Sequence, residues 1–244
     1  MSFQAKRTEF TTGDNLRNRS SIDAVLPAAN QHPLMPVAET FTLCGLMSDE
    51  PLRIQRCLAS DYERQEVSDF ISSVYYAVHH AVLKAFMPEL FSIRDSSYQL
   101  VAAVGLRPIQ DEPIFLEQYL TCQVEKCIRP FAGRDVPRQS IAEVGNLASI
   151  SAGSGRNLIA FLVHYMAENQ IDWAVFTGTN AVRGALTRMG ITYHMIEKAD
   201  PERLGEDRLL WGNYYNNSPF VLGVNIQLAH QVLKDKYHYG RCPL

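Results

Sequence analysis

Two polar residues in the segment EVGNLAS have side chains that can take part in general acid–base chemistry and in hydrogen bonding to a substrate. Glu143 lies in a run of apolar and small residues that predicts a strand, and Asn146 follows three residues later. A carboxylate can accept a proton, directly or through water, from an attacking nucleophile. An amide can orient a substrate or donate a hydrogen bond to a developing oxyanion. Glu143 and Asn146 are therefore candidate catalytic residues.

Both residues also have a structural interpretation, which the sequence leaves open. Glu143 can pair with an arginine from the preceding loop, such as Arg134 or Arg138. Asn146 can cap a bulge in the strand, because a short amide side chain often bonds to nearby backbone groups.

A glycine-containing loop follows the predicted strand. The sequence ISAGSG places Gly153 and Gly155 just before an apolar helical run. Backbone N–H groups at the start of a helix have no partner within it, and the helix dipole also favours anions there. The loop therefore predicts a site for the phosphates of a cosubstrate, and the N–H groups of Leu147 or Ala148 can serve an oxyanion. The residues expected to bind this cosubstrate are Leu147, Ala148, Ser149, Gly153, Ser154, Gly155, Arg156 and Asn157.

Four further residues are candidates for binding the acceptor. Glu117 lies between apolar residues in FLEQYL, where a carboxylate needs a partner or a shifted pKa. It can bind the amino group of an acceptor, with a salt bridge as the alternative. Trp211, Tyr214 and Tyr215 can line an acceptor or acyl pocket, with an ordinary place in the core as the alternative.

The composition excludes several classes of protein. The net charge of −3 argues against nucleic acid as a partner, because phosphate neutralisation needs a basic face. No HExxH or similar metal pattern occurs, so no metal site is predicted. The G-x-S-x-G elbow of a serine hydrolase is also missing.

The cysteines and the N-terminus predict a cytoplasmic protein. The five cysteines are an odd number and form no CxxC pair, which favours a reducing compartment over a disulfide framework. Cys122 and Cys127, five residues apart, are expected to be structural. The sequence contains no apolar run near the ~20 residues of a membrane span. Its polar start also lacks the apolar region of a signal peptide.

The order of predicted elements indicates an α/β architecture. Residues 1–45 are polar and without period, which predicts a mobile or extended N-terminal arm before a domain at 46–244. Ser60 and Glu63 predict a capping box that begins a helix ending near Pro88. Strands are predicted at 52–57, 91–94, 98–106, 140–147, 173–177 and 192–196, and further helices at 158–169, 181–189 and 226–236.

The strand, glycine loop and helix at 142–190 resemble the GNAT acyltransferase superfamily. In that family a Q/R-x-x-G-x-G/A loop holds the diphosphate, and the strand before it diverges from the next strand to admit the pantetheine arm of the donor. Gly153 and Gly155 match the loop, but Ile150 replaces its Gln or Arg, and Arg156 can supply the charge instead. Leu186 stands where many acetyltransferases carry a general-acid tyrosine.

Several motifs together resemble the thermostable hemolysin family of bacteria. They are EVGNLASI, FLEQYL, WAVFTGT, ADPERL and WGNYY, and they cover roughly residues 50–230. That family is similar to the acyl-homoserine-lactone synthases, which have a GNAT fold. The resemblance implies a GNAT-like mixed central sheet flanked by helices.

The same resemblance implies an N-acyltransferase that acts on a small, amino acid-like amine. The cosubstrate would be acyl-CoA or an acyl-phosphopantetheine on acyl carrier protein, with no cofactor bound permanently. Four arginines near the cleft would receive a carrier protein, and a homodimer is compatible with this prediction. They are Arg129, Arg134, Arg138 and Arg156.

Two other functions remain open. The family name suggests a membrane-active haemolytic protein, although the missing signal peptide counts against it. A haemolytic phenotype can also come from a lipid-like product. A catalytically silent GNAT-like binding module is the third hypothesis, based on the departures at Ile150 and Leu186.

Overall fold

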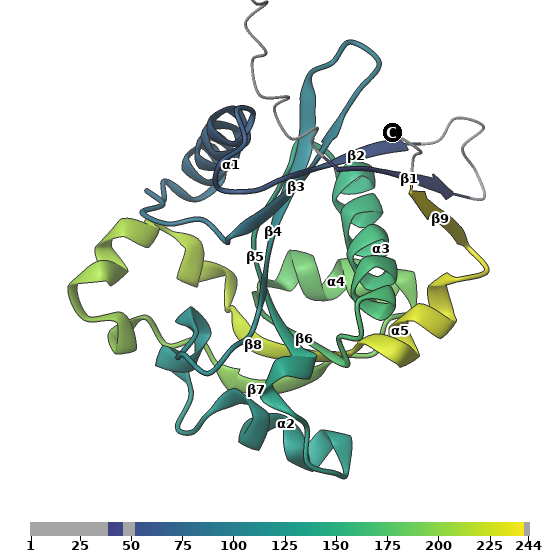
Figure 1. Ribbon diagram of the computed structural model, residues 1–244. Helices are drawn as coiled ribbons and strands as arrows, with labels where there is room; N and C mark the ends of the chain where they lie inside the picture. Colours follow the sequence, from purple (N-terminus) through teal and green to yellow (C-terminus); the bar gives the residue numbers. More distant parts are fainter. Residues whose placement is uncertain (1–38, 46–51, 242–244) are drawn as a thin grey trace, which may run out of the picture. The chain divides into compact units, whose positions relative to one another are not determined.

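A nine-stranded mixed sheet forms the centre of the fold (Figure 1). The computed structural model describes residues 39–45 and 52–241, which all belong to the unit Pro36–Leu244. The strand order is β7-β8-β6-β5-β4-β3-β2-β1-β9. The strands are β1 (Thr40–Gly45), β2 (Leu52–Cys57), β3 (Glu89–Arg94), β4 (Leu100–Pro108), β5 (Ile141–Ser149), β6 (Trp173–Gly178), β7 (His194–Lys198), β8 (Phe220–Asn225) and β9 (Tyr237–Arg241).

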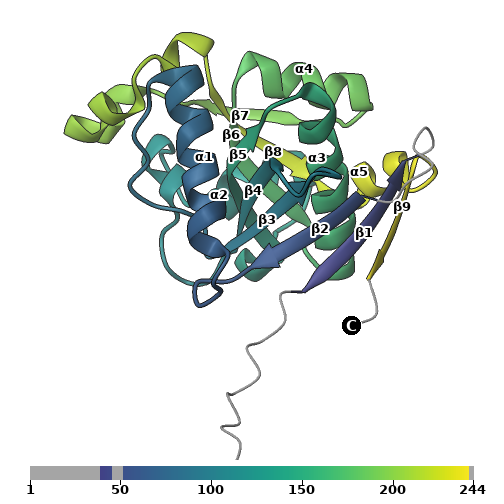
Figure 2. The same ribbon diagram turned by 90° about the horizontal axis from the view of Figure 1, so that it is seen from above.

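Helices cover both faces of this sheet (Figures 1 and 2). Helix α1 lies on one face, and α3, α4 and α5 lie on the other. The α-helices are α1 (Arg64–His79), α2 (Val124–Ala132), α3 (Ala152–Glu168), α4 (Asn180–Met189) and α5 (Ile226–Leu233). Short 3-10 helices are η1 (Phe115–Tyr119), η2 (Arg138–Ser140), η3 (Pro201–Trp211) and η4 (Tyr214–Asn217). The predicted α/β class with a GNAT-like mixed sheet is confirmed.

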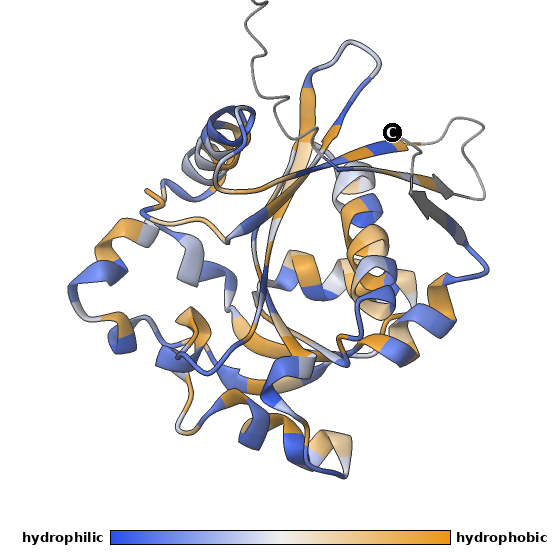
Figure 3. Cartoon of the chain, in the orientation of Figure 1, coloured by the Kyte–Doolittle hydropathy of each residue, from blue (hydrophilic) through white to orange (hydrophobic). Residues whose placement is uncertain are grey.

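The pleat of the strands assigns alternate residues to the two helical layers. Ala102, Val104 and Leu106 pack against α3, whereas Ala103 packs with residues of α1. The central strands and the middle of α3 are largely hydrophobic (Figure 3). At the other end of the α1 face, η1 and α2 pack over β6 and β8 through Trp173 and other apolar residues.

Within the described residues, only one pair of neighbouring strands is parallel. Strands β5 and β6 run in the same direction, joined by α3, while all the other pairs are antiparallel. The predicted strand–helix–strand unit is thus present. Helix α3 begins at Ala152 rather than at the predicted residue 158, because Ser151 caps it by accepting a hydrogen bond from the Ser154 N–H at 3.2 Å.

Helix α1 is shorter than predicted at both ends. Ser60 does not cap it; the helix begins at Arg64, after a turn in which Asp61 Oδ2 accepts from the Leu58 N–H. It ends at His79, because His80 adopts a left-handed conformation with a φ of 54°. The chain then continues without regular structure through 81–87 toward β3.

Three strands were not predicted from the sequence. Strand β1 lies in the segment expected to be an arm, and it pairs with both β2 and β9. Residues 40–45 thus follow the extended alternative, whereas residues 1–38 lie outside the described ranges. Strands β8 and β9 are the other two, and the helix α2 extends into a predicted loop. Within residues 39–45 and 52–241, no helix is long and apolar enough to span a membrane.

Candidate active site

The two parallel strands separate at Glu143. The ladder between β5 and β6 has three rungs, and the last joins Glu143 to Val175. Beyond this rung the strands run on to Ser149 and Gly178, and a cavity of about 460 Å³ opens between them. This volume falls within the ~300–1,000 Å³ typical of ligand sites. The divergence that the GNAT resemblance implies is therefore present.

The cavity has a polar end and an apolar end. The polar end, on the α1 face, contains Glu143 and Arg107 together with His79 and Tyr214. The apolar end reaches the layer of α3, α4 and α5. Its side chains include Leu162, Val163, Met166, Leu186 and Val224. Such a site suits a ligand with one polar end and one long hydrophobic end.

Glu143 is almost completely buried at the polar end, with only 2% of its surface exposed. Its Oε1 atom accepts a hydrogen bond from the Leu116 N–H at 3.0 Å. Its Oε2 atom has no hydrogen-bond partner among the described residues and lies 3.6 Å from Arg107 Nη1. One carboxylate oxygen is thus held in place while the other remains available.

Burial raises the pKa of Glu143 above its usual range. The Leu116 N–H and the Arg107 guanidinium oppose this rise, because both favour the charged carboxylate. A carboxylate with a raised pKa is a stronger base than one in water, which suits proton abstraction. Arg134 or Arg138 was the salt-bridge partner that the sequence suggested for Glu143. The structure pairs it instead with Arg107, which the sequence had not singled out.

Asn146 lies in a bulge of β5. Its φ of 54° is left-handed, and the register with β4 shifts so that neither Asn146 nor Leu147 has a partner in the ladder. Its Oδ1 atom accepts from the Met87 N–H at 2.8 Å, and its Nδ2 atom donates to Ala85 O at 3.5 Å. The side chain therefore fastens the segment that follows α1, which corresponds to the structural alternative.

Two paired glycines make room for the same segment. Gly105 on β4 and Gly145 on β5 are directly opposite each other, and Met87 lies over both. A Cβ atom at Gly105 would come within 2.6 Å of Met87 Cβ. The segment 81–87 can therefore pack closely on the sheet and form one wall of the cavity.

His79 and Tyr214 also line the cavity, and the sequence did not predict a role for His79. Their rings meet edge to face, with centroids 5.1 Å apart. Gly212 permits this contact: its φ is 51°, and a Cβ atom there would lie 2.1 Å from His79 O. Burial lowers the pKa of His79, so its imidazole is neutral over a wider pH range.

The three aromatic candidates occupy two different places. Trp211 and Tyr214 line the cavity, and Tyr214 Oη also donates to Thr177 O at 3.4 Å. The Tyr215 hydroxyl instead forms a 2.6 Å hydrogen bond with the hydroxyl of Tyr119, which is buried. Two of the three are thus in a position to contact a ligand.

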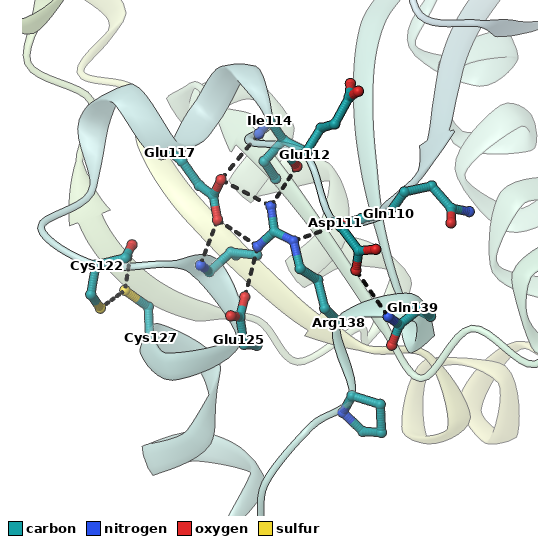
Figure 4. A network of polar contacts seen from close by, with 12 residues as sticks. Gln110, Asp111, Glu112, Ile114, Glu117, Cys122, Glu125, Cys127, Arg138 and Gln139 are labelled. Atoms are coloured by element: carbon teal, nitrogen blue, oxygen red, sulfur yellow. Dashed lines mark hydrogen bonds and ion pairs between the residues drawn. The ribbon is translucent and has the colours of Figure 1, made fainter.

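Glu117 is held in a salt bridge (Figure 4). Its two oxygens accept from Arg138, at 2.7 and 3.0 Å, and from the N–H groups of Ile114 and Val124. Arg138 also bonds to Glu125 at 2.7 Å. These bonds outweigh the effect of burial and lower the pKa of Glu117. The salt-bridge alternative therefore describes this carboxylate, and it does not line the cavity.

The predicted donor residues surround the start of α3. Leu147 and Ser149 line the cavity, whereas Ala148 faces the α1 layer. Gly155 allows α3 to begin close to β5, because a Cβ atom there would lie 2.9 Å from Ser149 Oγ. The other four donor residues, Gly153, Ser154, Arg156 and Asn157, lie in the first turns of α3, beyond the cavity lining.

Solved structures with a similar fold include two acyl-homoserine-lactone synthases and an N-acyl amino acid synthase. The chain resembles the acyl-homoserine-lactone synthase LasI, with a TM-score of 0.51, 12% identity and coverage of 79% of this chain and 95% of that one. The chain also resembles FeeM, an N-acyl amino acid synthase from uncultured soil microbes, with a TM-score of 0.50, 13% identity and coverage of 74% of this chain and 94% of that one. For BjaI, a CoA-dependent acyl-homoserine-lactone synthase solved with SAM and isopentyl-CoA, the TM-score is 0.50 and the identity 12%. The match covers 74% of this chain and 87% of that one.

Sequence comparison identifies the family. No curated protein sequence matches the chain. The family model described as thermostable hemolysin matches residues 58–230, which is more than half of the chain. This match covers the strands that separate at Glu143, the bulge at Asn146 and all the aromatic residues of the cavity. The chain therefore belongs to the thermostable hemolysin family.

Proposed function

We propose that this protein is an N-acyltransferase that moves an acyl group from a thioester to the amino group of a small acceptor. One observation carries the proposal: the parallel strands separate at a buried carboxylate that has one oxygen without a hydrogen-bond partner. A base placed where the cavity changes from polar to apolar can act on an acceptor beside the thioester of an acyl chain.

The acyl chain occupies the apolar end of the cavity. A chain lying there would contact Leu162 and Val163 of α3, Leu186 of α4, and Val224 of β8. Leu186 is 3% exposed. At this position a leucine extends the apolar surface, whereas the tyrosine of many acetyltransferases would bring a hydroxyl into it. The departure at Leu186 therefore favours a longer acyl group over acetyl.

The acceptor carries both an amino and a carboxylate group. Glu143 can take a proton from its amine, and Arg107, 37% of whose side chain is exposed, can bind its carboxylate in a bidentate pair. The two protein groups have opposite charge and lie side by side, as the two charges of an amino acid do. An amino acid-like acceptor is therefore the class that fits.

The reaction balances with one base. Glu143 accepts the amine's proton as the nitrogen attacks the thioester carbonyl, and a C–N bond forms. The C–S bond then breaks, and the thiolate leaves and takes up the proton that Glu143 accepted, directly or through water, which regenerates the carboxylate. Backbone N–H groups at the bulge near Leu147 are the proposed donors to the oxyanion, and Asn146 is a positioning residue that holds the segment 81–87.

We propose acyl-CoA as the donor, with its phosphates at the N-terminus of α3 and its pantetheine arm along β5. Carrier protein remains the alternative. Three of the four arginines expected to receive one are already paired, with Asp135, Asp172 and Glu117. Among the described residues, Arg156 forms no ion pair within 4 Å. Arg156 is therefore the cation available for a CoA phosphate.

The cellular location, the type of acceptor and the need for a cofactor are proposed as the sequence predicts them. We propose that it takes place in the cytoplasm, on a small-molecule acceptor, without nucleic acid and with no permanently bound cofactor. Among the described residues, no cluster of three or more His, Cys, Asp or Glu side chains can hold a metal ion. A homodimer stays a prediction.

Two assays on purified protein test the proposal. Thermal unfolding would be measured with acyl-CoAs of increasing chain length, followed by thiol release with and without a mixture of amino acids. We expect long-chain acyl-CoA to raise the midpoint and amino acids to stimulate thiol release. Binding without release would favour a silent binding module. Lysis of erythrocytes by protein alone, without acyl donor, would favour the membrane-active alternative over a lytic product.

A further inference from the structure

Two cysteines lie in contact beside the start of α2. The Sγ atoms of Cys122 and Cys127 are 2.7 Å apart, and Cys127 Sγ lies 3.6 Å from Cys122 O (Figure 4). This separation is shorter than the ~3.5–4.0 Å that is typical of non-bonded carbon atoms in contact. A disulfide has an S–S length of ~2.05 Å, so the sulfurs need to move together by only about 0.7 Å to form one.

The surroundings of the two thiols differ. Cys122 is exposed, just before α2, whereas Cys127 is partly buried within the helix. Burial and the contact with Cys122 raise the pKa of Cys127 to about 12. Cys127 therefore stays a protonated thiol near neutral pH, and Cys122 is the sulfur that a dissolved reagent can reach.

We propose that Cys122 and Cys127 form a reversible disulfide, with low-molecular-weight disulfides as the oxidant. The Cys122 thiolate attacks the S–S bond of oxidised glutathione, forms a mixed disulfide and releases one glutathione thiolate. Cys127 gives its proton to solvent and attacks the Cys122 sulfur, which releases the second glutathione thiolate. The protein thiols are oxidised by two electrons, and one glutathione disulfide is reduced to two thiols.

This disulfide would close the loop that supports the candidate active site. Glu117 Oε1 accepts from the Val124 N–H at 2.9 Å, so the residues between η1 and α2 are already tied together at that point. The same 3-10 helix supplies the Leu116 N–H that holds Glu143. Because the sulfurs are almost in place, oxidation would lock the present conformation and restrain the chain from η1 to the start of α2. This inference does not depend on the proposed function.

The other cysteine with a described side chain is a poor competitor for this bond. Cys57 is fully buried, and burial raises its pKa to about 11. It packs with residues of α1 on a different part of the sheet from Cys127, which packs with η1 and α2. Among the three cysteines whose side chains the structure describes, the pairing should therefore be specific to Cys122 and Cys127.

Peptide mapping of the full-length protein tests the pairing. Trypsin cleaves after Lys126, and prolines follow Arg107 and Arg129, so the two cysteines fall in separate peptides, 95–126 and 127–134. The protein would be equilibrated over a series of ratios of reduced to oxidised glutathione, alkylated and digested. We expect the two peptides to be joined under oxidising ratios and separate after reduction. Separate alkylation at every ratio, or a bond to another cysteine, would overturn the proposal.

Thermal unfolding and amide exchange test what the bond does. Closing so short a loop should raise the unfolding midpoint of the oxidised wild type by about 5 °C over the reduced form. Amide exchange in peptides covering 114–127 should slow on oxidation. The variants Cys122→Ser and Cys127→Ser should fold and show neither response. Equal midpoints and equal exchange in both redox states of the wild type would contradict the restraining role.

Discussion

Arg107 lies directly opposite Glu143 on the neighbouring strand, with Arg107 Nη1 3.6 Å from Glu143 Oε2. The carboxylate is buried and the guanidinium is partly exposed, so the pair joins the interior of the sheet to the mouth of the cavity. This distance is longer than a hydrogen bond, which leaves both groups able to bind a ligand. The pair therefore sets both the basicity of Glu143 and the proposed acceptor site.

Removing the guanidinium should affect both roles. In Arg107→Met, we expect the KM for an amino acid acceptor to rise about tenfold or more, because a charge-assisted pair with its carboxylate is lost. The acidic limb of the pH–rate profile should also move to higher pH, since Arg107 opposes the rise in the pKa of Glu143. Arg129→Met, which removes an exposed arginine paired with Asp135, is the control. An unchanged KM would remove Arg107 from the acceptor site.

The buried Glu143 and the partly buried Glu117 should affect stability with opposite dependence on pH. The folded-state pKa of Glu143 is raised, so its contribution to stability is present below the unfolded pKa of ~4.3 and is lost as the pH rises through the folded value. Glu143→Gln should therefore gain stability relative to the wild type as the pH rises. The pKa of Glu117 is lowered, so its contribution is present above ~4.3 and is lost as the pH falls.

Denaturant unfolding at several pH values measures this contrast. Glu117→Gln should be less stable than the wild type at pH 7, and the difference should shrink in acid. If both variants changed with pH in the same direction, the environments assigned to the two carboxylates would be wrong.

The fold should require a glycine at position 212 for two reasons: the backbone there lies close to the end of α1, and its φ is positive. Gly205 provides a matched control, since its φ of 57° is similar but nothing lies within 4 Å of a Cβ atom there. Gly212→Ala should cost several kcal/mol, because the Cβ atom would meet His79 O, whereas Gly205→Ala should cost only the ~1–3 kcal/mol of backbone strain. Unfolding free energies of the two variants measure the difference. Equal losses would show that α1 can move away.

A larger side chain at Leu186 should shorten the acyl chain that the enzyme accepts. Both Leu186→Phe and Leu186→Tyr add a ring at the apolar end of the cavity, and only the second adds a hydroxyl. We expect kcat/KM to fall for long acyl-CoAs and to hold for short ones in both variants, which a chain-length series would measure. The Phe variant separates the effect of volume from that of polarity. An unchanged chain-length profile would place the acyl chain elsewhere.

Local patterns predict the central part of this fold well. The strand, glycine loop, helix and strand from Ile141 to Gly178 are contiguous, so periodicity and capping residues suffice to place them. Helix α1 shows where such patterns fail. Its apolar period continues past His79, but a close approach by Gly212, more than a hundred residues away, coincides with its end. Contacts of that kind leave no local signal in one sequence.

The candidate site was predictable only in part for the same reason. Glu143 was identified because it lies on the predicted strand that leads to the glycine loop, yet its partner Arg107 depends on the register of two antiparallel strands. Glu117 was identified because it lies between apolar residues, but its charge is satisfied by Arg138, 21 residues along the chain. A buried carboxylate can therefore be recognised from sequence, whereas the structure decides whether it is free to react.

The most direct test is thiol release from a long-chain acyl-CoA in the presence of an amino acid acceptor, compared between the wild type and Glu143→Gln. The thermal shift with acyl-CoA alone would be measured first, to establish that the variant folds and binds the donor. The account predicts an unchanged shift and a decrease in kcat of about 10²–10⁴, the usual contribution of a general base. Equal turnover by the two proteins would contradict the role assigned to Glu143.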